Sequence, residues 1–204
     1  MLEIQNVECL NDTTLNIVKR RTKKNQILLY DTQRRFDDFV MKLKYRNNGK
    51  YEDIPHYIID KSGKIYKIFD TKYSSVTFDV PNIDKRQIKI AIENLGWLNK
   101  NTITGVLHNW INDPYRLVPF VKKWRGFYFW DEYTEEQYKS LSELCISLSI
   151  EHNIPYKSVP SQAIFSDSIK FKGIICKSNF NDIYKDINPS FDFKIFNEYD
   201  KEKR

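Results

Sequence analysis

Residues 56–69 read His-Tyr-Ile-Ile-Asp-Lys-Ser-Gly-Lys-Ile-Tyr-Lys-Ile-Phe, and this stretch decides the fold. Two short, largely apolar segments, 56–60 and 64–69, flank the turn sequence Lys61-Ser62-Gly63. A short loop that contains glycine, placed between two such segments, is typical of a β-hairpin. We therefore expect strands over 56–60 and 64–69 that pair in an antiparallel manner.

Other segments on both sides of this hairpin predict the rest of the framework. Buried strands are expected over 27–30, 87–93 and 171–176, because the residues there are apolar or alternate with period two. Apolar residues at helical spacing predict helices over 33–48, with Gly49 as its C-terminal stop, and over 134–152, opened by the capping box Thr134-Glu-Glu-Gln137. A short packed element is expected over 191–196. Together these elements predict a mixed α/β fold, a central mixed sheet flanked by helices.

Composition limits the class of protein. The 204 residues are 41% hydrophobic and 15% aromatic, which suffices for one packed domain. No apolar run approaches the roughly 20 residues that span a bilayer, and the N-terminus lacks the pattern of a signal peptide. We expect a protein without a membrane span, made in the cytoplasm and able to reach a virion by assembly. Three scattered cysteines argue against a disulfide framework and a four-thiolate zinc site.

The charge balance permits several anionic partners. The net charge is +6, from 33 basic and 27 acidic residues. The densest basic run, residues 19–24, is either a solvated loop before a strand or an anion-binding patch. Nucleic acid, anionic cell wall and acidic membranes all fit this balance. Nucleic acid is disfavoured, because the sequence contains no recognition motif for it.

Four phrases of the sequence, taken in order, resemble the type 2 N-acetylmuramoyl-L-alanine amidases. This zinc amidase family includes phage lysozymes of the amidase type and peptidoglycan recognition proteins. The phrases are the hairpin 56–66, Ile90-Ala-Ile-Glu93-Asn94, Tyr133-Thr-Glu-Glu-Gln137 and Asn188-Pro-Ser-Phe191-Asp-Phe193. The resemblance covers 26–95 and 131–197 of a single domain over 1–204. It leaves 1–25 as an N-terminal extension and 96–130 as an aromatic insertion.

The resemblance also implies a metal site, which this sequence does not reproduce. In the family, zinc is held by two histidines that end the first and last strands and by an Asp or Cys in the closing loop; a water takes the fourth position. These positions fall on Tyr30, Cys176 and Asn188. Tyr and Asn are poor zinc ligands, and a lone Cys cannot hold the ion. We expect the three residues to cluster as a degenerate site without metal or other cofactor, with zinc required only if the enzyme is active.

Some residues near these positions have candidate roles. A slipped metal site of Asp31, Cys176 and Asp186 is conceivable, but a one-residue shift turns Asp31 to the opposite face of the sheet. Glu93 matches the family's general-base glutamate, and Lys185 lies near its oxyanion-stabilising lysine. Without a metal, a strand-end salt bridge and a surface charge are the simpler roles for these two. Structural or solvent-exposed roles are expected for the three histidines, His56, His108 and His152.

Residues 96–133 hold all four tryptophans with little periodicity: Trp97, Trp110, Trp124 and Trp130. Several phrases here resemble a subgroup of phage-encoded amidase-like proteins. The rings have three interpretations: a satellite core over the mouth of the former groove, a surface that binds a partner, or a platform that stacks on sugars.

The resemblance and its departures lead to one functional prediction and one alternative. We expect an amidase-fold protein that has lost zinc-dependent peptidoglycan hydrolysis. It would be a structural or binding component of a phage particle, with protein partners in an assembly and peptidoglycan as its candidate ligands. The alternative is an active N-acetylmuramoyl-L-alanine amidase with non-standard ligands, which cuts between the lactyl group of muramic acid and L-alanine.

Overall fold

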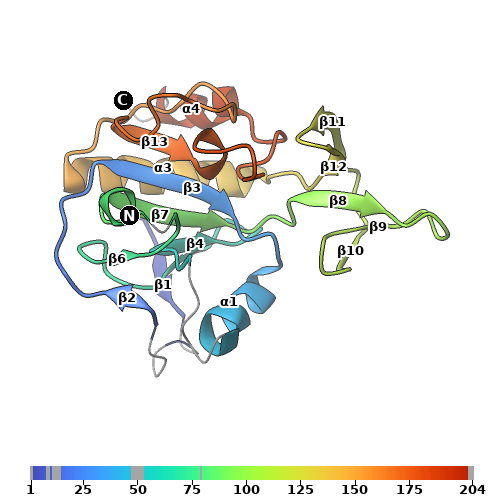
Figure 1. Cartoon of the computed structure of the whole chain (residues 1–204), viewed down its shortest axis with the longest axis horizontal. Coiled ribbons are helices and arrows are strands. Elements are labelled where there is room, and N and C mark those ends of the chain that lie inside the picture. The colour runs from blue at the N-terminus through green and yellow to red at the C-terminus, as the bar shows by residue number, and fades with distance from the viewer. Residues whose placement is uncertain (1, 8–9, 11–14, 47–52, 79, 202–204) are drawn as a thin grey trace.

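A six-stranded mixed sheet forms the centre of the molecule (Figure 1). The computed structural model describes residues 2–7, 10, 15–46, 53–78 and 80–201, so the predicted helix stop at Gly49 lies outside the described residues. The strand order is β1 (Ile4–Asn6), β5 (Ile65–Lys67), β4 (Tyr57–Ile59), β7 (Gln87–Ile92), β3 (Gln26–Asp31) and β13 (Gly173–Cys176). The predicted hairpin is confirmed as the antiparallel pair β4–β5.

Four of these strands, β4, β7, β3 and β13, run parallel to one another, so their carboxyl ends meet at one edge of the sheet. Every residue of β3 and β7 is buried. Complete burial is typical of strands that are covered on both faces, because each face of the sheet packs against other elements. The N-terminal extension adds to the same sheet, since β1 pairs in parallel with β5.

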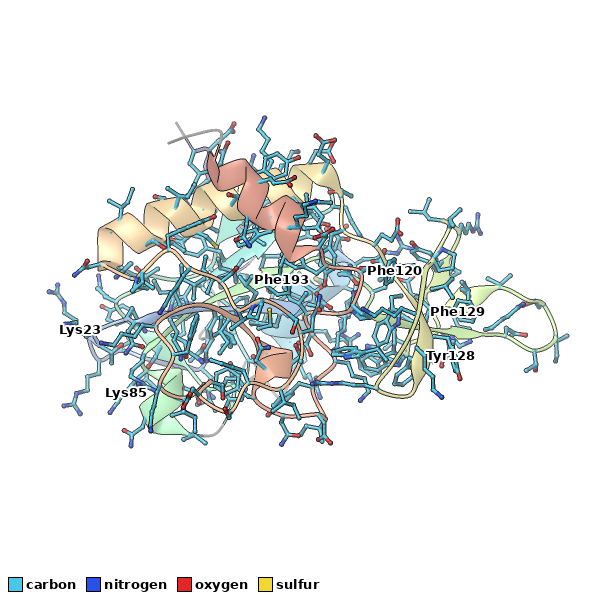
Figure 2. All side chains as sticks on the ribbon, turned by 90° about the horizontal axis from the view of Figure 1, so that it is seen from above. Lys23, Lys85, Phe120, Tyr128, Phe129 and Phe193 are labelled. Carbon is cyan, nitrogen blue, oxygen red and sulfur yellow. The ribbon has the colours of Figure 1, made fainter. Side chains whose placement is uncertain are left out.

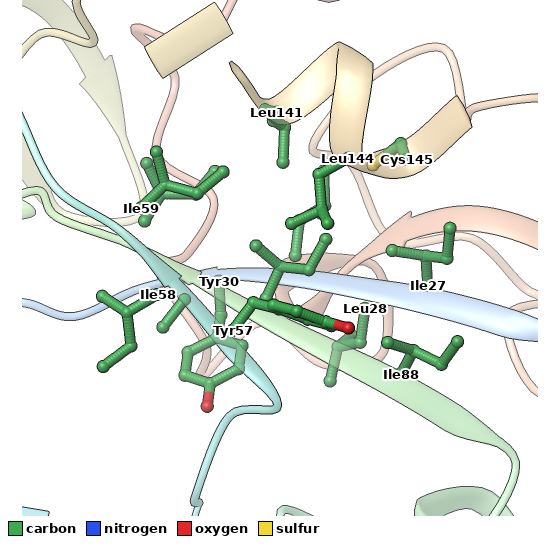
Figure 3. Packing of buried hydrophobic residues seen from close by; sticks show 14 of the residues in the cluster. Ile27, Leu28, Tyr30, Tyr57, Ile58, Ile59, Ile88, Leu141, Leu144 and Cys145 are labelled. Atoms are coloured by element: carbon green, nitrogen blue, oxygen red, sulfur yellow. The ribbon is translucent and has the colours of Figure 1, made fainter. Parts of the chain in front are cut away.

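Helices cover the two faces of the sheet. The long helix α3 (Glu135–His152) and the C-terminal helix α4 (Phe193–Lys201) lie on one side, and α1 (Phe36–Tyr45) lies on the other (Figure 1). Figure 3 shows Leu141, Leu144 and Cys145 of α3 above Ile27, with Tyr30 pointing to the opposite side of the sheet. The two sides are called the α3 face and the α1 face below.

The helix termini follow local sequence. The predicted capping box is confirmed: the Thr134 hydroxyl accepts from Gln137 N and the Gln137 side chain accepts from Thr134 N, both at 3.1 Å. Helix α1 begins at Phe36 rather than 33. Residues 33–35 turn instead, because Gln33 has a positive φ of 55° and Arg34 forms a bridge with Asn94.

The aromatic insertion forms a second sheet that extends from the body of the molecule (Figure 1). Its antiparallel order is β10 (Pro114–Tyr115), β9 (Leu107–His108), β8 (Trp97–Lys100), β12 (Phe127–Trp130) and β11 (Phe120–Trp124). The sequence did not predict these strands, because they are short and lack a regular alternation. Smaller elements are the pair β2 (Ile17–Val18) and β6 (Ser74–Ser75), and the single-turn helix α2 (Pro81–Asp84). In the described residues, no helix has the length and hydropathy needed to cross a membrane.

Candidate functional site

The carboxyl edge of the central sheet brings together most of the residues that the sequence singled out, but not in one cluster. In the β3–β13 register, Cys176 lies level with Leu29. Partners in a parallel ladder point to the same face and successive residues alternate. Tyr30 therefore points to the α1 face and Cys176 to the α3 face. The expected common cluster of Tyr30, Cys176 and Asn188 is wrong in this respect.

On the α1 face, Tyr30 has a lysine beside it. The Tyr30 hydroxyl donates to Asp53 O at 2.9 Å. Lys177 follows the last residue of β13, and its Nζ lies 2.5 Å from Asp53 Oδ2 and 5.2 Å from the centre of the Tyr30 ring. The residue that lies beside Tyr30 at the end of β13 is therefore Lys177, a cation paired with the Asp53 carboxylate.

The charge of Lys177 is secured by its surroundings. Burial by itself lowers the pKa of a lysine, but the attraction of Asp53 and then of Asp186 outweighs it, and the pKa of Lys177 is raised above its ordinary value. The same ammonium lies 5.1 Å from the Tyr184 ring. Lys177 therefore stays charged throughout the neutral pH range.

On the α3 face, a buried polar network surrounds Asp31. The Tyr133 hydroxyl donates to Asp31 Oδ1, and Asn188 N donates to Asp31 Oδ2 at 3.3 Å. Asn188 Nδ2 donates to Asn94 Oδ1 at 2.8 Å and to Asp131 O at 3.3 Å. Burial raises the pKa of Asp31 well above its ordinary value, and repulsion from other carboxylates adds to this. The sequence-predicted Asn188 thus contacts Asp31 rather than Tyr30.

The side chains at the expected ligand positions, Tyr30, Cys176 and Asn188, do not fit a zinc ion, which takes thiolate, imidazole and carboxylate ligands. Tyr30 uses its hydroxyl hydrogen on a backbone oxygen, and Lys177 is a cation. Burial raises the pKa of the Cys176 thiol well above its ordinary value, which disfavours the thiolate. The Asn188 side-chain oxygen accepts from Ser190 N at 2.9 Å and from Ser190 Oγ at 2.7 Å. In the described part of the chain, no three His, Cys, Asp or Glu side chains are grouped so as to hold a metal.

The slipped site of Asp31, Cys176 and Asp186 fails for a related reason. Asp31 does lie on the face of Cys176, as the strand alternation requires. Its two carboxylate oxygens, however, accept from Tyr133 and Asn188, while Asp186 accepts from Gln33 Nε2 at 3.4 Å.

Glu93, the candidate general base, is tied to two backbone amides. Its Oε1 accepts from Phe36 N at 3.0 Å and its Oε2 accepts from Lys61 N at 2.8 Å. The first residue before α1, Arg35, makes no side-chain capping bond, so Glu93 caps this helix from the neighbouring strand. Glu93 is therefore a junction of β7, the hairpin turn and α1, rather than the salt-bridge partner considered from the sequence.

Glu93 also lines a cavity of about 790 Å³ between the central sheet and the insertion. The insertion contributes residues 114–118 to its wall, and the body contributes Glu93, Lys61 and Asp131. Lys61 and Asp131 form an ion pair at 2.9 Å. This volume lies in the range of small-ligand sites, and its walls combine apolar surface with paired charges.

Lys185, the residue near the position of the family's oxyanion-stabilising lysine, contacts the insertion. Its Nζ lies 5.5 Å from the Trp97 ring and 5.6 Å from the Phe127 ring, and it donates to Ile183 O at 3.2 Å. These contacts are cation–π packing between the closing loop and the aromatic insertion.

The four tryptophans differ in exposure. Trp130 is fully buried, so the prediction that its side chain contacts a partner is corrected. Trp97 and Trp124 are half-buried, and Trp110 is 45% exposed. Ring centres of Trp124 and Trp130 lie 5.4 Å apart, and those of Trp97 and Phe127 lie 5.2 Å apart. The rings thus form a satellite core, with Trp110 left at the surface.

The structural role expected for the hairpin histidine agrees with its contacts. His56 is completely buried and stacks on Phe69 with centres 4.1 Å apart. Its Nδ1 accepts from Lys89 N at 3.0 Å, which leaves Nε2 to donate to Tyr73 O at 3.2 Å. The other two histidines are half-buried: His152 contacts the Thr71 hydroxyl at 3.0 Å, and His108 contacts a neighbouring carbonyl.

Three residues of the candidate site were not predicted from the sequence. Lys177 lies one residue beyond the expected position on β13, Asp53 lies in the connection before the hairpin, and Tyr133 precedes the cap of α3. The sequence carried no signal for Lys177, because the face it shares with Tyr30 depends on the register between β3 and β13.

The mixed sheet, the capped helix behind it and a cavity at the carboxyl edge define an amidase-like α/β domain. The family model described as N-acetylmuramoyl-L-alanine amidase matches residues 20–175, more than half of the chain. The chain belongs to this family, the type 2 N-acetylmuramoyl-L-alanine amidases. No curated protein matches it in sequence.

Solved structures share the fold at low identity. N-acetylmuramoyl-L-alanine amidase LysC from Clostridium intestinale URNW is 14% identical with a TM-score of 0.54, over 98% of this chain and 99% of its own. The Ph2119 endolysin from Thermus scotoductus MAT2119 bacteriophage Ph2119 is 11% identical with a TM-score of 0.56, over 97% and 98%. Drosophila Peptidoglycan Recognition Protein (PGRP)-SA is 9% identical with a TM-score of 0.54, over 98% and 92%.

The buried network predicts a specific pH dependence. A carboxyl group whose pKa is raised by folding contributes stability that is complete below its unfolded pKa, near 4, and is lost as the pH rises through its folded pKa. Asp31→Asn removes the titrating group and keeps the shape. We expect its free energy of unfolding to rise relative to wild type between pH 5 and pH 8, by on the order of 1 kcal/mol.

Urea unfolding at several pH values measures this difference. The matched control is Asp167→Asn, which removes an exposed carboxylate and should track wild type at every pH. If Asp31→Asn is instead least stable relative to wild type at pH 8, Asp31 is stabilised as a carboxylate and the argument fails.

Proposed function

We propose that this protein binds peptidoglycan without hydrolysing it, as a structural or binding component whose setting is a phage particle. Membership of the amidase family supports the choice of ligand. The phage setting is supported by fold neighbours that are named as endolysins, one of them from a bacteriophage. Zinc-dependent cleavage is the activity that this member has lost.

The observation that carries the proposal is the ion pair of Lys177 and Asp53 beside Tyr30. Lys177 lies beside Tyr30 as a charged ammonium, which has no lone pair to offer and therefore cannot be a zinc ligand. Without a metal, no bound water is acidified and no carbonyl is polarised. Glu93 does not substitute for the metal, because a carboxylate neither acidifies a bound water nor polarises a carbonyl.

The cavity beside Glu93 and the surface of the insertion supply the proposed binding site. Large apolar side chains are exposed along the insertion: Ile103, Val106, Trp110, Leu117, Val118, Val121 and Tyr128. Aromatic rings stack well on the apolar faces of sugars. The cavity wall carries charges of both signs, among them Arg35 and the ion pair Lys61–Asp131, which suit a peptide stem that is also charged in both senses.

Elemental analysis and a peptidoglycan-release assay test the proposal together. Purified protein should contain substoichiometric zinc, and it should release no soluble product from dye-labelled cell walls, with an active endolysin as positive control. The protein should nevertheless sediment with insoluble peptidoglycan. Release of product that a chelator abolishes would overturn the proposal and establish the active amidase. Failure to sediment would also overturn it.

A further inference from the structure

A basic pocket lies at the edge of the sheet opposite the candidate site, where β3 and β7 begin. Its volume is about 390 Å³. Five of its seven lining residues are cationic and none is acidic: Arg20, Arg21, Thr22, Lys23, Asn25, Lys85 and Arg86. Figure 2 shows Lys23 and Lys85 at one end of the molecule, with Phe120, Tyr128 and Phe129 of the insertion at the other. The two ends of the protein thus differ in chemistry.

The walls of the basic pocket are held in place by hydrogen bonds between distant segments. Lys24 Nζ donates to Lys85 O at 3.0 Å, and these residues are 61 positions apart. Asn25 N donates to Arg86 O at 3.0 Å. The Arg86 guanidinium donates to Ile169 O at 2.8 Å, which fixes its orientation. The pocket is therefore formed by ordered backbone rather than by one loop.

The positive charge of the basic pocket is not neutralised locally. Within the described residues, no ion pair joins an acidic group to Arg20, Arg21, Lys23 or Lys85. Beneath the pocket, burial and then the nearby charge of Lys89 lower the pKa of Lys24 to about 7. Converging cations without counter-charges attract anions.

Two polar atoms of the lining residues have spare hydrogen-bonding capacity. Thr22 Oγ1 and Asn25 Oδ1 are buried and have no partner in the described part of the chain. Such groups are costly unless something satisfies them. Both atoms lie beneath the pocket surface, so an anion would be recognised by the exposed cations Arg20, Arg21, Lys23 and Lys85 rather than by these two oxygens.

We propose that the basic pocket binds a phosphate group of a polyol phosphate polymer, the chemistry of an anionic cell-wall chain. Arginine and lysine match the phosphate. The choice of a wall polymer rests on the proposed function, whereas the anion site itself does not. Duplex DNA also carries phosphodiesters and is the competing outcome.

Binding of fluorescently labelled poly(glycerol phosphate) tests this proposal through anisotropy at 50 and 200 mM salt. Arg21→Gln/Lys85→Gln should weaken binding about tenfold or more, because two phosphate contacts are lost, and should reduce the salt dependence. The matched control is Lys122→Gln/Lys123→Gln, which removes two exposed charges from β11. It should change affinity by less than about twofold. Thermal melting should show all proteins folded.

Several results would overturn the proposal. These are no binding by wild type, an equal loss in the control variant, or tighter binding of duplex DNA at the same phosphate concentration. Sedimentation with peptidoglycan stripped of wall polymer separates this proposal from the proposed function. Arg21→Gln/Lys85→Gln should leave that sedimentation unchanged, so either idea can fail while the other stands.

Discussion

Lys177→Met is expected to lower the free energy of unfolding by about 2–4 kcal/mol at pH 7, the cost of breaking a buried charge pair from one side. The lysine side chain is 11% exposed and that of Asp53 is 24% exposed, so solvent relieves only part of the penalty. Methionine keeps the length of the side chain but leaves Asp53 and Asp186 without their cation. Urea unfolding measures the loss.

Two further variants separate charge from packing. Lys185→Met removes a half-buried lysine that stacks on Trp97, and it should cost about 1 kcal/mol or less. Asp53→Asn combined with Lys177→Met should be more stable than Lys177→Met alone, with a coupling of roughly 1–3 kcal/mol. Asn is compatible with the positive φ of 68° at position 53. If Lys177→Met costs no more than Lys185→Met, the fixed cation is not held as described.

The sequence predicted the central framework because its signals are local. The alternation of Ile88, Ile90 and Ile92 and the capping box at Thr134 each depend on a few neighbouring residues, and both are confirmed. The insertion gave no such signal. Its strands are two to five residues long, and their pairing depends on tertiary contacts that periodicity does not encode.

The prediction of the candidate site was wrong by one residue on the last strand of the sheet. The family positions on β3 and β13 are separated by many residues, and a one-residue error in aligning a strand exchanges its two faces. Cys176 was therefore grouped with Tyr30, whereas the register puts Lys177 there. Only the pairing Cys176–Leu29 reveals this, and a single sequence does not contain it.

The correction changes what the edge of the sheet implies. Cys176 and Asn188 lie on the α3 face, where Asn188 belongs to the buried network around Asp31. Tyr30 and Lys177 belong to the α1 face. Of the 17 large hydrophobic side chains that are exposed in the described residues, seven lie in the insertion.

Trp130→Ala is expected to lower the free energy of unfolding by about 3–5 kcal/mol, the usual cost of truncating a buried tryptophan. The side chain is completely buried, its Nε1 donates to Lys122 O at 2.8 Å, and its ring contacts Trp124 and Phe127. Trp130 ends β12, where the insertion joins the body, so the loss should propagate through the satellite core. Urea unfolding followed by tryptophan fluorescence measures it.

Trp110→Ala is the matched variant, because it makes the same change at a ring that is 45% exposed. It loses one hydrogen bond to Gln33 O and the contact with the Arg34 guanidinium, which together stabilise by about 1 kcal/mol. In binding, by contrast, Trp110→Ala should show a clear loss. The variant should remain folded but bind peptidoglycan about three- to tenfold more weakly than wild type in the sedimentation assay, as expected for an aromatic contact residue. If Trp130→Ala is no less stable than Trp110→Ala, the insertion is not a satellite core built on Trp130. If Trp110→Ala sediments like wild type, the insertion is not a binding surface that uses Trp110.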